Sequence, residues 1–378
     1  MDLQTCRSEI SQIDEQIVAL FQKRMALSKE IALLKKENRL PIFDSERERA
    51  VLNRVTALAG EELADYTGVL YQTVFDVSRS YQHAVINQPG KISALLETVC
   101  AETPQLPPPR AVIACQGAEG AYSQHACDKM FKYPSILYFS TFKDVCKAVD
   151  SGLCRYGVLP IENSTAGSVN EVYDLLHAYH FYITHSMKLH IAHTLLAPRG
   201  TKLEEIKEIC SHEQALRQCS DFLTQSGCKP RLCQNTAQAA KLVAESGRTD
   251  MAAIGSRDCA ELYDLEILSD DVQNNRNNYT RFICISKTPE IYPGAKKTSL
   301  LLTLVHKPGA LYHAIARFAS LGLNLTKLES RPIPGSDFEF LFYFDIEAPV
   351  SSPALRALIA RLERNGEQFA YLGTYTED

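Results

Sequence analysis

Two positively charged residues lie within an apolar stripe near the start of the chain, an unusual place for charge. Arg24 and Lys35 are 11 residues apart, so on a helix their directions differ by only about 20°. The stripe recurs at three- and four-residue steps, as an amphipathic helix requires, and comprises Ile10, Ile13, Ile17, Leu20, Phe21, Leu27, Ile31 and Leu34. A buried cation without a partner is costly, and two on one face are costlier. We therefore expect an anion to bind among the helices of this region.

Two other interpretations of these cations remain open. Either side chain can lie along apolar surface with its charged end in water. The nearby acids Asp44 and Glu48 can also supply the counter-charge as a structural ion pair. Two cations at the centre of one stripe favour the ligand pocket over the first alternative.

Three more polar residues extend this pattern. Ser78 and Gln82 are four residues apart, beside the apolar stripe of a later helix. Arg7 precedes Arg24 by 17 residues, which is about 25 Å along a continuous helix. One small ligand cannot be held by both arginines of the same helix. If Arg7 belongs to the pocket, it comes from another copy of the chain, which predicts an intertwined dimer with two shared pockets.

Polar turns follow several short apolar runs in the centre of the chain. They include a glycine-rich turn at 117–123, the run at 160–165, the helix starts at 211–216 and 235–236, and the run at 278–282. Turns that open helices carry free backbone amides, which bind anions. Ligands of such sheets bind at the C-terminal ends of the strands. We therefore expect a second anion site in this region.

Composition limits the function classes. The chain has 378 residues, enough for two or three domains, and a net charge of −5, which argues against nucleic acid or an anionic membrane as partner. No apolar run approaches the roughly 18 residues of a membrane span, and the start lacks a signal-peptide layout. The 12 cysteines form no C-x-x-C pair and no cluster with zinc spacing, which indicates reduced thiols of a cytoplasmic protein. We expect no metal and no cofactor.

Three segments must position these groups. Residues 1–90 predict an all-helical domain, in which Pro41 ends the first helix, Ser45 and Glu48 form a capping box, and Gly60 closes the second helix. Residues 91–110 predict a linker with a proline-rich end. Residues 111–290 predict an α/β domain with a largely parallel sheet, divided between two lobes. Residues 298–378 have the order βαββαβ, the ferredoxin-like α+β plan.

The polar residues of the first 85 positions resemble, in order, the all-helical class of chorismate mutases; they are Arg7, Arg24, Lys35, Asp44, Arg47, Glu48, Ser78 and Gln82. The resemblance implies the rearrangement of chorismate to prephenate, which needs capture of a folded dianion and stabilisation of charge on the ether oxygen. It implies that Arg7 and Arg24 bind the two carboxylates. Lys35 and Gln82 then donate to the ether oxygen, and Glu48 accepts from the ring hydroxyl. Asp44, Arg47 and Ser78 then shape the pocket. For Asp44 and Ser78, a helix cap and a solvated polar group are close competing interpretations.

The segment from 111 to 286 resembles the prephenate dehydratases. The strongest pieces are PIENS, followed by Gly167 and Val169, and the triplet at 280–282. The family usually carries a small hydroxyl residue where Ala121 stands, which weakens one substrate contact. The resemblance implies a two-lobed fold like the periplasmic binding proteins and the loss of carboxylate and hydroxide from prephenate. Thr280 would assist the departing hydroxyl by hydrogen bonding or proton donation.

The prephenate-binding set implied by the resemblance is Glu162, Asn163, Ser164, Thr165, Thr280, Arg281 and Phe282. For two members another interpretation competes. Glu162 can orient a neighbour instead of touching substrate, and Arg281 is about equally well explained as an exposed cation at a strand edge.

The C-terminal segment resembles the amino-acid-binding regulatory module called ACT. The residues that carry this resemblance, or that it implies as phenylalanine ligands, are Gly309, Ala310, Leu311, Asn324, Glu329, Ser330 and Arg331, with Pro332 after them. Phenylalanine would be held between two such modules. The competing interpretation is a plain packing domain with ordinary turns.

Together the segments resemble the bifunctional chorismate mutase–prephenate dehydratases of phenylalanine biosynthesis. The implied partners are chorismate, prephenate and phenylalanine as allosteric effector, in a homodimer at least. One alternative is a phenylalanine-binding regulatory protein whose α/β lobes have lost catalysis. A narrower alternative keeps the dehydratase but uses the helical domain only for dimerisation.

Overall fold

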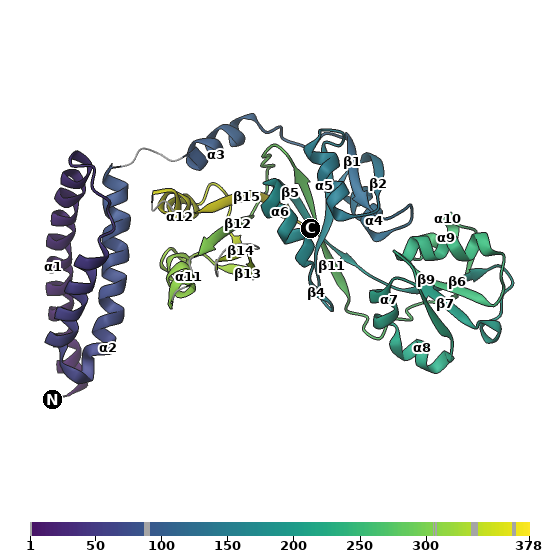
Figure 1. Ribbon diagram of the computed structural model, residues 1–378, viewed down its shortest axis with the longest axis horizontal. Coiled ribbons are helices and arrows are strands. Elements are labelled where there is room, and N and C mark those ends of the chain that lie inside the picture. Colours follow the sequence, from purple (N-terminus) through teal and green to yellow (C-terminus); the bar gives the residue numbers. More distant parts are fainter. Residues whose placement is uncertain (1, 87–90, 305, 307, 334–338, 365–367) are drawn as a thin grey trace. The chain divides into compact units, whose positions relative to one another are not determined.

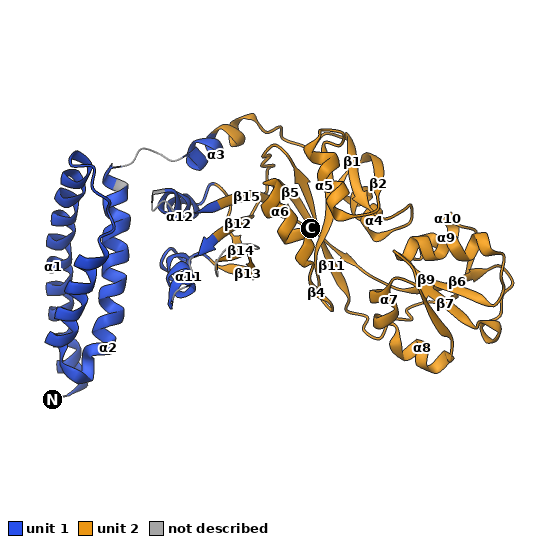
Figure 2. Cartoon of the chain, in the orientation of Figure 1, with its two compact units in different colours: residues 1–97, 303–323, 351–369 blue, residues 98–302, 324–350, 370–378 orange. Residues whose placement is uncertain are grey.

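The computed structural model describes residues 2–86, 91–304, 306, 308–333, 339–364 and 368–378 (Figure 1). The chain divides into two compact units (Figure 2). The first unit comprises residues 1–97, 303–323 and 351–369, and the second comprises residues 98–302, 324–350 and 370–378. No helix in these ranges combines the length and apolarity that a bilayer crossing requires.

The first unit is built mainly from helices. α1 (Leu3–Glu37) and α2 (Ser45–Ile86) pack against one another. Gly60 interrupts α2 with a φ of 76°, a conformation that only glycine adopts at low cost. The predicted helix break is therefore confirmed. The unit also contains α11 (Ala310–Ser320), α12 (Pro353–Arg364) and the first half of α3 (Lys91–Glu102).

One local expectation for this region differs from the structure. Asp44, not Ser45, caps α2, because its Oδ1 accepts a hydrogen bond from the backbone N–H of Arg47 at 2.9 Å. The stretch predicted as a linker contains a helix, α3, over most of its length. The apolar stripe of α1 is exposed within a single chain: Ile17 is 57% exposed and Leu27 66%.

The second unit contains a 10-stranded sheet in the order β13-β14-β12-β15-β5-β11-β3-β1-β2, with β4 paired to β3. β1 is parallel to β2 and β3, whereas β11 is antiparallel to both β3 and β5. The sheet is therefore mixed and not largely parallel as predicted. The strands of its dehydratase-like part are β1 (Arg110–Gln116), β2 (Tyr133–Phe139), β3 (Tyr156–Asn163), β4 (Gly167–Ser168), β5 (Tyr182–His190) and β11 (Tyr279–Ser286).

Helices cover both faces of this part of the sheet. The helices are α4 (Tyr122–Met130), α5 (Phe142–Asp150) and α6 (Asn170–Tyr179). Alternate residues of β11 enter two different apolar cores. Ile283 packs with the residues of α5 and α6, while Phe282 packs with those of α4.

A five-stranded sheet in the order β10-β6-β9-β7-β8 forms the second lobe. The chain passes between the two sheets after β5 and again before β11, which confirms the two-lobed α/β prediction. The elements of this lobe are β6 (Thr194–Pro198), η1 (Leu203–Glu205), β7 (Glu208–Ser211), α7 (Glu213–Gln218), α8 (Ser220–Ser226), β8 (Lys229–Leu232), α9 (Thr236–Ser246), β9 (Met251–Gly255), α10 (Asp258–Leu262) and β10 (Leu265–Ser269).

The C-terminal strands extend the large sheet. They are β12 (Lys297–Leu304), β13 (Leu325–Pro332), β14 (Phe340–Glu347) and β15 (Phe369–Glu377). Taken with α11 and α12, they have the predicted order βαββαβ and the strand arrangement of the ferredoxin-like plan. The end of β15 pairs in parallel with β5, Thr376 opposite His185. The predicted border at 290–298 therefore falls inside one continuous sheet and stays a prediction.

Candidate functional site

A cavity of about 480 Å³ lies between the two sheets of the second unit. Its wall includes the residues where the chain crosses between lobes, Ile191 and His193, and the starts of α4, α7 and α9. Residues described as lining it include glutamines, asparagines, histidines and hydroxyl side chains, but no lysine or arginine. An anionic ligand here would depend on neutral donors and on helix N-termini, chiefly those of α4 and α9.

Thr280 and Asn163 face this cavity from adjacent strands, β11 and β3. Asn163 Nδ2 donates to Thr280 Oγ1 at 2.9 Å, and Asn163 Oδ1 accepts from the backbone N–H groups of Thr165 and Ala166 at 3.0 and 2.8 Å. Both ends of the Asn163 amide are thus fixed. Because the Thr280 oxygen accepts from Asn163, the Thr280 proton is free to be donated elsewhere.

A chain of amides continues from Asn163 into the other lobe. Asn163 Nδ2 also donates to Asn278 Oδ1 at 2.8 Å, and Asn278 Nδ2 donates to Gln218 Oε1 at 3.1 Å. Gln218 Oε1 lies 2.9 Å from His193 Nε2. Since an amide oxygen only accepts, this contact assigns the proton of His193 to Nε2.

Two buried polar atoms of this amide chain, His193 Nδ1 and Gln218 Nε2, have no hydrogen-bond partner among the residues that the structure describes. Both residues line the cavity. With the assigned tautomer, His193 Nδ1 is an acceptor, while Gln218 Nε2 is a donor. Burial lowers the pKa of His193, against the opposing effect of its bond to Gln218. A polar ligand in the cavity would satisfy both atoms.

The predicted prephenate residues separate into three groups. Asn163, Thr280 and Phe282 line the cavity. Ser164 instead joins the adjoining backbone: its Oγ accepts from the N–H of Tyr279 at 2.9 Å. Thr165, the remaining hydroxyl of that loop, lines a neighbouring hollow.

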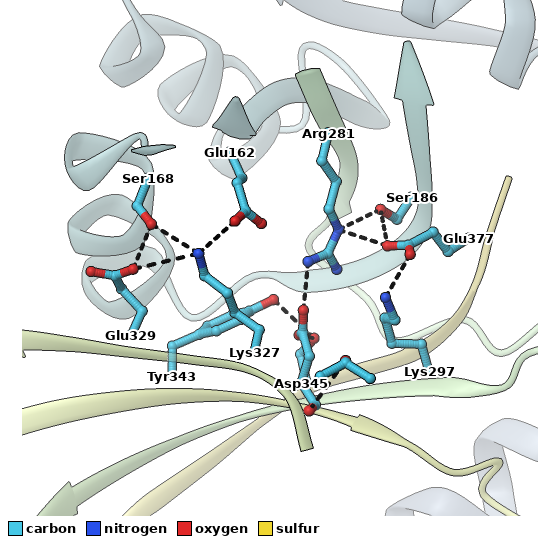
Figure 3. A network of polar contacts seen from close by, with 12 residues as sticks. Glu162, Ser168, Ser186, Arg281, Lys297, Lys327, Glu329, Tyr343, Asp345 and Glu377 are labelled. Atoms are coloured by element: carbon cyan, nitrogen blue, oxygen red, sulfur yellow. Dashed lines mark hydrogen bonds and ion pairs between the residues drawn. The ribbon is translucent and has the colours of Figure 1, made fainter. Parts of the chain in front are cut away.

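Arg281 and Glu162 do not line this cavity; both line a different hollow, of about 590 Å³, beside the C-terminal strands. Arg281 is only 5% exposed, so it is not the exposed cation that was one interpretation. Its guanidinium contacts Asp345 at 2.5 Å and Glu377 at 2.8 Å (Figure 3). Protein groups therefore occupy the guanidinium, and the expected contact between Arg281 and a substrate carboxylate stays a prediction.

Two of the helix starts predicted from the sequence lie in the cavity wall, and a side chain caps each of them. Asn235 caps α9 by accepting from the N–H of Gln238 at 2.7 Å, and His212 caps α7 through the N–H of Gln214 at 3.3 Å. Ala121 precedes α4 without any side-chain cap. The amides at the start of α4 are therefore less occupied than they would be beside a hydroxyl residue.

In the helical segment, three of the predicted chorismate residues, Arg24, Ser78 and Lys35, form hydrogen bonds within the chain. Arg24 Nη1 donates to Ser78 Oγ, and Lys35 Nζ donates to the backbone oxygen of Ile42 at 2.6 Å. Gln82 is buried, and within the described part of the chain its Oε1 has no hydrogen-bond partner. An orphaned buried acceptor one helical turn from Ser78, the partner of Arg24, is chemically suited to a bound polar ligand.

The remaining residues of that set are exposed or already paired. Glu48 forms an ion pair with Arg79, a residue that the sequence pattern did not single out. Asp44 caps α2, which was one of its two interpretations. Arg7 and Arg47 are exposed.

The predicted effector residues fall in both units. Gly309 precedes α11 with a φ of 81°, which fits a glycine, and Ala310 and Leu311 open that helix. In the second unit, Asn324 Nδ2 donates to Glu347 at 3.0 Å. Glu329 accepts from Ser168.

Sequence reasoning missed His193, Gln218 and Asn278 as parts of the cavity network. Gln218 closes a helix whose start was noted, and Asn278 precedes the Thr280 triplet, so both lay near recognised motifs. His193 stands between two strands with no motif around it, and no sequence signal could have identified it.

Family comparisons match two parts of the chain: chorismate mutase type II over residues 6–83 and prephenate dehydratase over residues 113–290. A bifunctional chorismate mutase/prephenate dehydratase from Enterobacter agglomerans is 32% identical, over 98% of this chain and 95% of that protein. An Arabidopsis thaliana protein named arogenate dehydratase/prephenate dehydratase 2 is 36% identical, over 71% of this chain and 74% of its own.

Solved structures also match about 70% of the chain. The prephenate dehydratase of Arthrobacter aurescens in complex with L-Phe superposes with a TM-score of 0.64 at 26% identity, over 70% of this chain and 89% of that one. A structure described as GqqA, a novel type of quorum quenching acylase, gives a TM-score of 0.64 at 34% identity, over 71% of this chain and 98% of that one.

Proposed function

Because the chain belongs to the bifunctional chorismate mutase/prephenate dehydratases, we propose that its two parts catalyse consecutive steps of phenylalanine biosynthesis. The helical segment rearranges chorismate to prephenate. The α/β lobes convert prephenate to phenylpyruvate with loss of carbon dioxide and water. Phenylalanine, the end product, inhibits by binding the C-terminal module. The 12 free cysteines fit a reducing cytoplasm.

The mutase step needs binding and charge stabilisation only. Arg24 and Arg7 bind the two carboxylates, and Lys35 and Gln82 donate to the ether oxygen as negative charge develops there. In this proposal the Nε2 of the buried Gln82 donates to the ether oxygen. Its orphaned Oε1 is an acceptor, which would bind a donor group of the ligand and not the ether oxygen.

A second copy of the chain completes the mutase pocket in this proposal. The apolar stripe of α1 is exposed in the single chain, including Ile10 at 56% and Leu34 at 57%. Burying such a stripe against its own copy would remove a large apolar surface from water. The same contact would bring the Arg7 of the second copy toward the Arg24 of the first.

The dehydratase step depends on assisting the departing hydroxyl. Thr280 accepts from Asn163 and so presents its proton to the hydroxyl leaving group. The Asn163 bond also stabilises negative charge that develops on the Thr280 oxygen as its proton moves. Gln218 and His193 supply a donor and an acceptor for polar groups of the substrate, and the start of α9 faces a carboxylate. Aromatisation of the ring provides the driving force.

The observation that carries this proposal is the bond from Asn163 to Thr280 at the wall of the cavity. The experiment is a chorismate feed to the purified chain, following prephenate and phenylpyruvate with and without phenylalanine. We expect phenylpyruvate to form and phenylalanine to suppress it. Thr280→Val should let prephenate accumulate, whereas Lys35→Ala should leave chorismate unchanged but added prephenate still consumed. If wild-type protein consumes neither compound, the regulatory alternative replaces this proposal.

A further inference from the structure

Two neighbouring residues of β11 point to opposite sides of the sheet. Thr280 lies at the dehydratase cavity, while Arg281 lies at the hollow beside the C-terminal strands. On the paired strand β3 the same division holds: Asn163 is opposite Thr280, and Glu162 is opposite Arg281. The strand pair that carries Thr280 therefore also carries a charged face toward β13 and β14.

The Arg281 side chain is enclosed by groups from the C-terminal strands. Its Nη1 donates to Asp345 of β14 at 2.5 Å, and its Nη2 donates to the hydroxyl of Tyr375 of β15 at 2.8 Å. Its Nε lies 2.8 Å from Glu377 and 3.0 Å from Ser186 (Figure 3). A planar guanidinium held at three nitrogens has one orientation.

The charges of this cluster are matched. Asp345 is fully buried and accepts a second bond from Ser299 at 2.5 Å. Glu377 is also bonded by Lys297, at 2.6 Å. Burial would lower the pKa of Arg281, but the neighbouring hydroxyls of Tyr375 and Tyr343 and the carboxylates of Asp345 and Glu377 raise this pKa overall. Arg281 thus stays charged, and it cannot leave Asp345 without stranding a buried charge.

A second set of contacts joins the same surfaces. Lys327 of β13 donates to Glu162 at 2.8 Å and to Ser168 at 3.0 Å, and Ser168 donates to Glu329 (Figure 3). Ser168 itself lines the dehydratase cavity. Arg331, two residues after Glu329 on β13, donates two hydrogen bonds to Asp174 of α6, at 3.0 and 2.9 Å.

We propose that Arg281 is a positioning residue, which fixes Thr280 at the cavity wall and links that wall to the C-terminal strands. It acts through the backbone of β11 and does not contact the substrate. A ligand that favours another placement of β13 and β14 then disturbs Asp345, Arg281 and Thr280 in turn. Lys327 provides a parallel link through Ser168. The inference rests on the proposed dehydratase activity and adds the connection through which phenylalanine acts.

The test uses the full chain with Arg281→Lys, which keeps the charge but loses the fork, and Lys327→Gln. The matched control is Arg257→Lys, since the ion pair of Arg257 with Asp270 is exposed. For Arg281→Lys we expect kcat of the dehydratase to fall by about 10- to 100-fold with little change in KM, because a displaced Thr280 affects the reacting step. For Lys327→Gln we expect the phenylalanine concentration at half-inhibition to rise by about fivefold or more.

Circular dichroism and urea unfolding establish whether each variant is folded. Wild-type kcat and wild-type phenylalanine response in folded Arg281→Lys and Lys327→Gln would overturn the inference. If Arg281→Lys does not fold, Lys327→Gln decides: an unchanged phenylalanine response overturns the link, and a weakened response supports it. Wild-type protein without dehydratase activity would instead refute the proposed function.

Discussion

Replacing Asp345 with asparagine should lower the free energy of unfolding strongly, although the two side chains are nearly equal in volume. The side chain keeps its volume but loses the charge that Arg281 requires, and both residues are buried. Breaking a buried ion pair by removing one partner costs about 3–5 kcal/mol. Glu377 still contacts Arg281 in the variant, so we expect the lower end, about 3 kcal/mol.

The chain contains no tryptophan, so urea unfolding is best followed by far-ultraviolet circular dichroism. The matched control is Asp270→Asn, which removes an acid from the exposed pair with Arg257 and should cost about 0–1 kcal/mol. The transition of the second unit should shift for Asp345→Asn and hardly at all for Asp270→Asn. Equal shifts for the two variants would show that burial adds nothing to the Arg281–Asp345 pair and would refute the reasoning.

Three further predictions address the other described features. Asn163→Ala should lower dehydratase kcat by about 100-fold while mutase activity stays at the wild-type rate; an unchanged kcat would remove Asn163 from the mechanism. Asp44→Ala should lower the unfolding free energy of the helical segment by about 1 kcal/mol, measured by thermal unfolding, and a neutral effect would contradict the cap. Burial lowers the pKa of His193 below its usual 6.5. As the pH is lowered through 6.5, the unfolded chain therefore binds more protons than the folded chain, and the free energy of unfolding decreases. His193→Gln should flatten this part of the stability–pH curve, and an unaltered curve would exclude His193 as a cause.

The fold was predictable wherever local pattern and packing agree. Short apolar runs became β1, β3, β7, β9 and β11, and Gly60 ended a helix because its positive φ excludes other residues. The choice between Asp44 and Ser45 as helix cap was not predictable, since both side chains suit the position and only the backbone decides. The apolar stripe of α1 indicates a buried face, but it is exposed in the single chain, because a sequence pattern does not say which copy covers it.

The candidate site was predictable in part for a similar reason. Thr280 and Asn163 belong to compact motifs that reach the same cavity. The face on which Arg281 lies depends on Asp345 and Glu377, which follow it by 64 and 96 residues in the sequence. Such pairings are decided by sheet register, and no local pattern contains that information.

The pairing of β15 with β5 has a consequence for dissecting this protein. Gly373 of β15 lies so close to Ile183 that an added Cβ would meet the Ile183 backbone oxygen at 2.2 Å, so the two backbones approach in a way that no other residue permits. A fragment that stops before β12 would uncover the hydrogen-bonding edge of β5. Uncovered edges recruit strands from other molecules. The dehydratase lobes expressed without their C-terminal strands should therefore self-associate, and any activity of that fragment would have to be measured on aggregates.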